Sequence, residues 1–194
     1  IKAAGGSDLG IPEDAEVNII VSSELRDRPP LAIDTSDPRL AVGHVGRVLH
    51  PEDTLQQELR TVLTYRTESS RLTLGCGMDH AIEARQAFTS DAAVGENVAA
   101  INFRGVLHPG EPLRFCKYLS YHYGPSNDSS RIRSQVGWSL DGARDAGFPA
   151  LLARQSRDLA EFWSHADIQI EADDPRMQQV IRWNLFQLFQ ASAR

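Results

Sequence analysis

Cysteine is scarce in this 194-residue sequence, and its two cysteines, Cys76 and Cys116, lie far apart along the chain. They form neither a CxxC motif nor a cluster with histidine, which argues against a zinc site and against a disulfide framework. A free cysteine usually behaves as a small buried hydrophobic residue. We therefore expect both on strands, in a reducing compartment, and assign the protein to the cytoplasm.

Long apolar runs are also missing, and the first residues lack the apolar stretch of a signal peptide. We expect no membrane association. The only methionines are Met78 and Met177, so we expect the chain to begin inside a longer or processed product. The composition, 41% hydrophobic and 24% charged, is globular, and the length suits one domain with or without an appendage.

A basic stripe of the kind that binds nucleic acid is absent as well. The formal net charge is −6, the sequence pI is about 5.5, and lysine and arginine are spread along the chain. Proteins that bind nucleic acid usually concentrate positive charge on one face, with aromatic residues between. We therefore expect no nucleic-acid partner.

Catalytic and metal-binding motifs are equally sparse. No G-x-S-x-G segment presents a serine as a nucleophile. The histidines show neither HxH nor HxxxH spacing, which favours hydrogen-bonded structural roles over metal ligation. They are His44, His50, His80, His108, His122 and His165.

Two glycine motifs have ordinary structural explanations. Gly75 and Gly77 flank Cys76 inside a strand, without the helix that a dinucleotide fold needs, which indicates a bulge or a close backbone approach. Residues 43–47 (GHVGR) form a glycine-bracketed loop beside a cation. Phosphate contact there is conceivable, but nothing places the loop at a helix N-terminus, so a plain loop is preferred.

An acidic group and two tryptophans are also better explained by structure. Glu171, Asp173 and Asp174 resemble a set of catalytic carboxylates, yet acids at a helix start also complement the helix dipole. Trp163 and Trp183 could stack on sugar rings, but their helical spacing favours core packing. We therefore predict no catalytic, cofactor-binding or metal-binding residue in this chain.

Residues 1–124 have the period of β-strands. The alternating segments are residues 16–25, 58–68, 71–83, 98–106 and 113–123. Ser69 and Ser70 predict a hairpin between the second and third, and the His-Pro-Gly-Glu-Pro turn at 108–112 predicts another between the last two. On the last strand the residues that share one face, interrupted by Lys117, are Leu113, Phe115, Leu119, Tyr121 and Tyr123. The pattern predicts antiparallel sheet with one buried face.

Residues 125–194 have the period of helices. Apolar residues recur at helical spacing over 132–143 and again over 148–162, after Gly147. An extended connector with Ile168 and Ile170 follows, and Asp174 followed by proline predicts the start of a last helix. The fold class is therefore α+β, with sheet in 1–124 and helices in 125–194.

The last helix is apolar around most of its circumference. Its apolar residues are Met177, Val180, Ile181, Trp183, Leu185, Phe186, Leu188 and Phe189. Such a helix needs partners on more than one side. Either it is enclosed within this chain or its partner lies beyond Arg194, and we expect the second.

Two segments resemble a known family. Residues 162–171 (FWSHADIQIE) and 178–194 (QQVIRWNLFQLFQASAR) are similar to the linker of glycoside hydrolase family 65, which includes maltose, kojibiose and trehalose phosphorylases. Only Trp183, where the family usually has Phe, departs noticeably from the pattern. Residues 17–25, 106–111 and 118–122 are similar to strands of the family's N-terminal sandwich, so the resemblance covers most of the chain.

The resemblance implies an architecture. Family members have a large N-terminal β-sandwich, a helical linker, an (α/α)6-barrel catalytic domain and a small C-terminal sheet domain. The chain would hold a portion of the antiparallel β-sandwich in 1–124 and the linker helices in 125–194, and would stop before the barrel. Apolar surfaces and strand edges left open by such a division lead us to expect a homo-oligomer.

The resemblance also implies a reaction. A barrel carboxylic acid protonates the glycosidic oxygen of an α-glucosidic disaccharide while inorganic phosphate, as co-substrate, attacks with inversion and gives glucose 1-phosphate. None of the barrel residues has a counterpart here, so we expect this chain alone to be inactive and to need no cofactor. Its partners would be the barrel of the same protein and, for the whole enzyme, the disaccharide.

An alternative is a free-standing β-sandwich module that binds carbohydrate or protein. A carbohydrate-binding module should expose a flat aromatic platform. The aromatic residues of this sequence lie at positions whose period predicts burial, which favours the first hypothesis.

Overall fold

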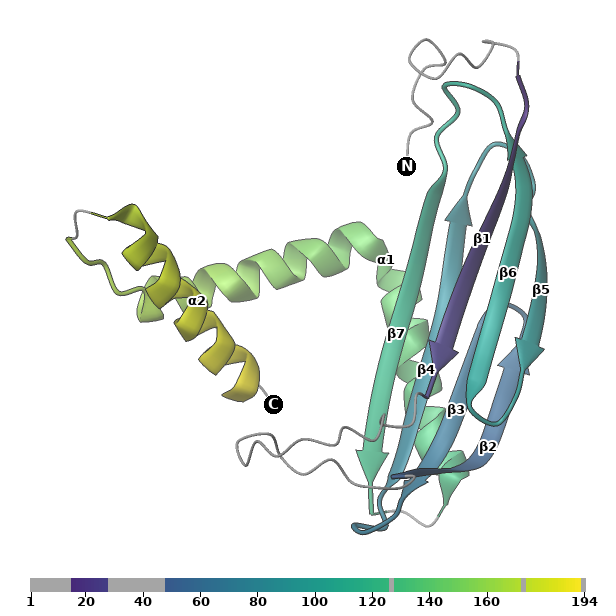
Figure 1. Ribbon diagram of the computed structural model, residues 1–194, viewed down its shortest axis with the longest axis horizontal. Helices are drawn as coiled ribbons and strands as arrows, with labels where there is room; N and C mark the ends of the chain where they lie inside the picture. The colour runs from purple at the N-terminus through teal and green to yellow at the C-terminus, as the bar shows by residue number, and fades with distance from the viewer. Residues whose placement is uncertain (1–14, 28–47, 126–127, 172–173, 193–194) are drawn as a thin grey trace, which may run out of the picture. The chain divides into compact units, whose positions relative to one another are not determined.

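The computed structural model describes residues 15–27, 48–125, 128–171 and 174–192. In this part of the chain seven strands precede two helices, and Figure 1 labels them. The strands are β1 Val17–Arg26, β2 Leu49–Gln57, β3 Arg60–Thr67, β4 Thr73–Glu83, β5 Thr89–Val94, β6 Val98–Leu107 and β7 Arg114–Gly124, and the helices are α1 Ser129–Ala166 and α2 Pro175–Ser192. The chain divides into two compact units, Ile1–Asp145 and Ala146–Arg194, with the division inside α1.

The first unit contains two antiparallel sheets, with strand orders β1-β6-β5 and β2-β3-β4-β7. Apolar side chains from both sheets form its core: Leu63, Tyr65, Met78, Ala99, Ile101 and Phe103. The predicted α+β fold with an antiparallel sandwich is confirmed. Strands β2, which has few apolar residues, and β5, whose apolar residues are consecutive and do not alternate, were not predicted from the sequence.

One of the two predicted hairpins is confirmed and the other is wrong. Strands β3 and β4 pair directly, and the Thr67 N–H donates to the Leu72 carbonyl at 2.9 Å across their turn. The turn after β6 also forms, with Gly110 at φ 82°. However, β6 pairs with β1 and β5 whereas β7 pairs with β4, so this turn carries the chain from one sheet to the other.

The four-stranded sheet is buried on both faces, not on one as the alternation predicted. All residues from Thr61 to Tyr65 of β3 are buried. One face meets the other sheet, and the other face meets the first half of α1 through its inward residues Ile132, Val136 and Leu140. The first half of α1 is therefore part of the core of the first unit.

Gly75 and Gly77 allow α1 to lie directly on β4. A Cβ at Gly75 would stand 2.7 Å from the Ile132 side chain, and one at Gly77 would stand 2.4 Å from the Val136 side chain. Both separations are shorter than any ordinary carbon–carbon contact. The close backbone approach predicted from this motif is confirmed.

The second unit begins where α1 bends. Gly147 has φ 74°, outside the helical range, and Pro149 follows it. The helix then continues to Ala166, where Phe162 stacks on Phe189 of α2 with ring centroids 4.3 Å apart. The predicted start of α2 is confirmed, because Asp174 Oδ1 accepts a hydrogen bond from the Arg176 N–H at 2.9 Å, as an N-cap does.

The connector before α2 is extended and is held by two side chains of α2. Gln178 accepts a hydrogen bond from the Ile170 N–H at 3.0 Å and donates one to the Ile168 carbonyl at 2.8 Å. Arg182 and Asp167 add a two-pronged ion pair, with Arg182 Nε 2.8 Å from Asp167 Oδ1. The family-like segments at 162–171 and 178–192 thus bond to each other.

Candidate functional site

His80 is the one fully buried histidine among the described residues, and it joins the two sheets. Its Nδ1 lies 2.9 Å from the Leu59 carbonyl oxygen, and its Nε2 lies 2.7 Å from Ser23 Oγ on β1. The carbonyl can only accept, so Nδ1 carries the proton and Ser23 donates to Nε2. The ring packs against Phe103 and Phe115, and burial lowers the pKa of His80. This is a structural histidine.

Three of the other described histidines also have structural surroundings. His50 pairs with Glu68, His122 Nε2 lies 2.7 Å from Ser139 Oγ on α1, and His165 bonds at the end of α1. Over the described part of the chain, no three His, Cys, Asp or Glu side chains are grouped as metal ligands. His44 and the loop at 43–47 lie outside the described residues, as does Asp173 of the acidic group.

The cysteines are unpaired thiols on opposite faces of one sheet. Cys76 faces the sandwich, where burial and then the charge of Asp27 raise the pKa of its thiol to about 11. Cys116 is half-buried on the α1 side. Cys76 therefore lacks the lowered pKa of a reactive nucleophile.

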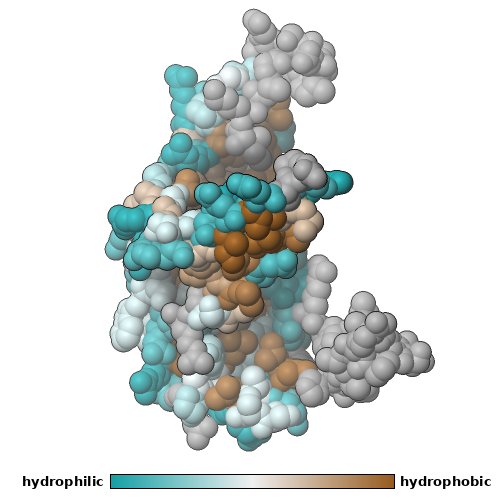
Figure 2. Space-filling model, turned by 90° about the vertical axis from the view of Figure 1, so that its left-hand side faces the viewer, coloured by the Kyte–Doolittle hydropathy of each residue, from teal (hydrophilic) through white to brown (hydrophobic). Residues whose placement is uncertain are grey.

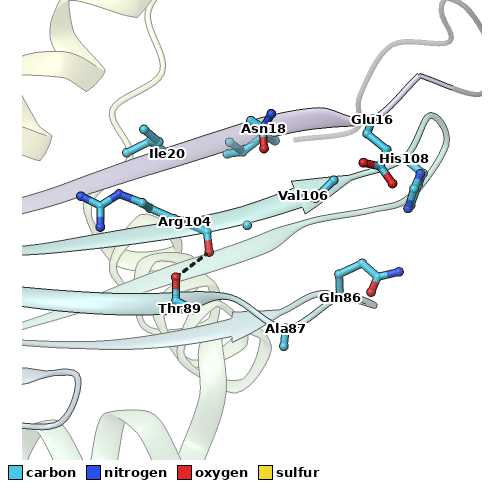
Figure 3. Close-up of a pocket in the computed structure, with 11 residues that line it drawn as sticks. Glu16, Asn18, Ile20, Gln86, Ala87, Thr89, Arg104, Val106 and His108 are labelled. Atoms are coloured by element: carbon cyan, nitrogen blue, oxygen red, sulfur yellow. Dashed lines mark hydrogen bonds between the residues drawn. The ribbon is translucent and has the colours of Figure 1, made fainter.

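An open pocket of about 760 Å³ lies over β1, β6 and the segment before β5, as Figure 3 shows. Its polar groups include Asn18, Arg104, His108 and one carboxylate, Glu16. Acid-catalysed glycoside cleavage by water uses two carboxyl groups on opposite sides of the bond. This pocket supplies one and has no aromatic floor, so it lacks the groups of a glycosidase site.

A charged cluster beneath α1 has a structural function. Asp79 is buried on β4, and Arg60 binds it with Nη2 at 2.7 Å and Nε at 3.0 Å. Arg60 also bonds Asp141 of α1 at 2.5 Å, and Arg144 lies 3.5 Å from Asp79. Burial opposes the charge of Arg60, but its bonds to Asp141 and Asp79 outweigh burial and raise its pKa. The two arginines and two aspartates neutralise each other and hold α1 on the sheet.

Part of the apolar surface of α2 is exposed. Its exposed side chains are Met177, Val180, Trp183 and Leu188, between 51% and 67% accessible. Figure 2 shows apolar side chains gathered on the helices of this unit within a hydrophilic surround. Core packing of Trp183 is therefore wrong as a prediction, whereas Trp163 is half-buried against Phe162. Exposed apolar clusters of this kind mark interaction sites.

Two tyrosines of β7 are exposed as well. Tyr121 is 58% accessible and Tyr123 is 75% accessible, next to Leu119 at 50%. The prediction that these residues share a face is confirmed, but the expected burial of the aromatics is wrong here.

No helix among the described residues is long and apolar enough to cross a membrane.

Comparison with known proteins identifies the class. Residues 11–162 match the model of the N-terminal domain of glycosyl hydrolase family 65, and the chain belongs to this family. It is 35% identical over 180 residues to an uncharacterised glycosyl hydrolase of Mycobacterium tuberculosis, covering 92% of this chain and 22% of that protein. A relative of Mycobacterium leprae is also 35% identical, over 93% of this chain and 23% of its own length.

Two further proteins are similar to the chain. It is 25% identical over 161 residues to the alpha,alpha-trehalose phosphorylase of Thermoanaerobacter brockii, covering 83% of this chain and 21% of that protein. A solved structure described as "Putative kojibiose phosphorylase from human microbiome" superposes with a TM-score of 0.71 over 92% of this chain and 22% of its own, at 19% identity, which shows a shared fold. The chain thus spans about a fifth of the length of the proteins that it matches.

Proposed function

We propose that this chain is the non-catalytic N-terminal part of an enzyme that cleaves an α-glucosidic disaccharide with inorganic phosphate, inverting the anomeric carbon and releasing glucose 1-phosphate. The observation that carries the proposal is the family match over residues 11–162. The similarity to a trehalose phosphorylase supports phosphate as the acceptor.

The side chains of the described residues support a non-catalytic assignment. The open pocket on β1 and β6 has a single carboxylate, and the buried carboxylate Asp79 is neutralised by Arg60. A carboxylate bonded in this way cannot protonate a glycosidic oxygen. The acid and the phosphate-binding groups then belong to the remainder of the enzyme, which we propose is a barrel domain and the main partner of this chain.

The exposed face of α2 is the contact surface that this assignment requires. Leu188 and Trp183 together present a large apolar surface, and burying a leucine side chain contributes about 1.5–3 kcal/mol. We propose that the barrel covers this face, that the whole enzyme is a cytoplasmic homo-oligomer, and that the chain itself binds no cofactor.

Activity assays test the proposal. The full-length protein and the 194-residue chain are incubated with maltose, kojibiose or trehalose, with and without phosphate, and glucose 1-phosphate and glucose are quantified. We expect glucose 1-phosphate from the full-length protein only, from one of the sugars, and only with phosphate. Release of free glucose without phosphate would establish hydrolysis instead, and product from the 194-residue chain would refute its non-catalytic assignment.

A variant of α2 tests the contact surface. Leu188→Ser should leave the stability of the 194-residue chain within about 0.5 kcal/mol, because the side chain is exposed there. In the full-length protein it should cost about 2 kcal/mol, because the leucine is then buried. The matched control is Ile20→Ser, an exposed apolar residue of β1, which should be neutral in both proteins.

The exposed pair Tyr121 and Tyr123 favours a second candidate, a sandwich module that binds carbohydrate, because it supplies an aromatic surface. Calorimetric titration of the 194-residue chain with the three disaccharides distinguishes the two. We expect no heat of binding. A saturable heat that Tyr121→Ala abolishes would support the module.

A further inference from the structure

Strand β1 contributes little apolar surface to the core of the sandwich. Of its ten residues only Ser23 is fully buried, and this residue is polar. The apolar residues Val21 and Leu25 are partly buried against a core that is built from β3, β4 and β6. Among the described strands, β1 pairs only with β6. An element with few buried apolar contacts opens at a lower cost in free energy than the core of the same domain.

Two polar side chains of the facing sheet bond to β1. The Ser23 hydroxyl donates to Nε2 of His80 at 2.7 Å, and the Glu24 carbonyl accepts from Nζ of Lys117 at 2.7 Å. His80 and Lys117 are opposite each other on the paired strands β4 and β7, and their bonds reach consecutive residues of β1. The carboxylate of Glu24 is itself paired with Arg26 at 2.9 Å. The bonds made by His80 and Lys117 are called here the β1 clamp.

The closed clamp favours a neutral His80. Its Nδ1 is bonded to the Leu59 carbonyl, and its ring packs against Phe103 of β6 and Phe115 of β7. A proton added at Nε2 would therefore place a cation in apolar surroundings. The Ser23 hydroxyl would then accept instead of donate, but a hydroxyl carries no charge to balance the cation. Burial accordingly lowers the pKa of His80.

The neighbouring charges do not reverse the effect of burial. After burial, which lowers the pKa of His80 most, the bond to the Leu59 carbonyl raises it, the positive charge of Lys117 lowers it and the charge of Asp79 raises it. The carboxylate of Asp79 lies on the opposite face of β4, where Arg60 of β3 binds it at 2.7 Å. The net direction is therefore set by the apolar surroundings of the ring, and Lys117 acts in the same sense.

We propose that the β1 clamp is a proton-sensitive latch, whose release of β1 from the four-stranded sheet is favoured below about pH 6.5 while the core of β3, β4 and β6 stays folded. When β1 lifts off, His80 meets water and takes up a proton that the closed form refuses. The contribution of the clamp is thus present above about pH 6.5 and is lost as the pH falls toward the pKa of the closed form. One proton limits the rise of the opening constant to about tenfold between pH 7.5 and 5.5.

Hydrogen exchange of the full-length protein tests the proposal, resolved by peptide with mass spectrometry at pH 7.5 and 5.5 and corrected for the intrinsic rates. The reporting peptide covers β1, whose odd-numbered amides bond to β6, since the Asp27 N–H donates to the Asn97 carbonyl at 2.9 Å and the direction alternates along a strand. Comparison peptides cover β3 and β4. We expect the protection of β1 to be lower than that of β3 and to fall by about two- to tenfold at pH 5.5.

Two variants separate the proton from the bonds. His80→Gln keeps a hydrogen-bonding side chain that does not titrate, so the pH dependence of β1 should disappear. Lys117→Met removes the bond to the Glu24 carbonyl and should lower the protection of β1 at both pH values while the pH dependence remains, because His80 still titrates. Equal protection of β1 and β3, a pH effect on β1 below twofold, an unchanged pH effect in His80→Gln, or unchanged protection in Lys117→Met would each overturn the proposal.

Discussion

The packing of α1 on β4 makes Gly77→Ala the most demanding test of this structure. The new methyl group would stand 2.4 Å from Val136 Cγ1, 3.0 Å from Leu140 Cδ1 and 3.3 Å from Val62 Cγ2. All three neighbours are buried, at 0–1% accessibility, so none can move into solvent. Overpacking of a dense core costs about 1–3 kcal/mol, and the three contacts put this variant near 3 kcal/mol.

Urea unfolding of the 194-residue chain, followed by circular dichroism, measures this cost. In thermal unfolding, the same loss of about 3 kcal/mol should lower Tm by roughly 6–12 °C for a chain of this size. Gly142→Ala is the matched control, because the same methyl group would meet nothing within 4 Å on the helix. Gly142→Ala should raise the free energy of unfolding by about 0.5–1 kcal/mol, because alanine has a higher helix propensity than glycine.

A double mutant then separates the clash from any general effect of alanine. Val136→Ala alone removes two buried carbons and costs about 2 kcal/mol. Combined with Gly77→Ala, it makes room for the new methyl group, so the pair should cost about 2 kcal/mol and not the sum of about 5. Additive losses, or a Gly77→Ala variant within 0.5 kcal/mol of the parent, would refute the proposed packing.

Three further outcomes follow from the structure. Arg60→Met leaves the buried Asp79 with only Arg144, at 3.5 Å, and should cost about 3 kcal/mol in urea unfolding. Arg154→Met, which breaks an exposed pair, should change stability by less than about 0.5 kcal/mol. The pKa of His80 is lowered in the folded chain, so below pH 6.5 the unfolded chain takes up a proton that the folded chain refuses. The free energy of unfolding should therefore fall as pH drops from about 6.5 to the folded pKa, and a His80→Gln variant that retains this slope would contradict the assignment. Asp174→Ala removes the N-cap of α2 and should cost the helix about 1 kcal/mol, seen as faster hydrogen exchange in its first turn.

Local features of the fold were predictable because they depend on neighbouring residues. The period-2 pattern located β1, β3, β4, β6 and β7, and the Asp-Pro pair located the start of α2. Partners of strands were not predictable in the same way. A turn such as the one after β6 fixes a change of direction, but the next strand can pair either beside the last one or in the facing sheet. Packing in the core shared by both sheets decides between these two pairings, and the residues that make its contacts are far apart in the sequence.

The candidate surfaces were predicted less well than the fold. The spacing of Leu119, Tyr121 and Tyr123 correctly grouped them on one face, yet nothing in that spacing tells whether a second layer covers the face. The same holds for Trp183, because apolar residues recur at the same helical spacing whether the face that they form is buried or exposed. Periodicity identifies an apolar face, whereas burial depends on what packs against it.

One signal in the sequence does carry information about the second layer. Residues 61–65 and 72–78 contain no charged side chain, although half-buried strands alternate apolar with polar residues, as β1 does. A strand without charge on either face indicates cover on both, and paired glycines at 75 and 77 indicate that the cover comes very close. Ile132, Val136 and Leu140 have the spacing of one helix face and the branched apolar side chains to fill that contact. Asp79 is the first charge after this run, on the same side as the glycines, so it is buried with them and requires the ion pair with Arg60.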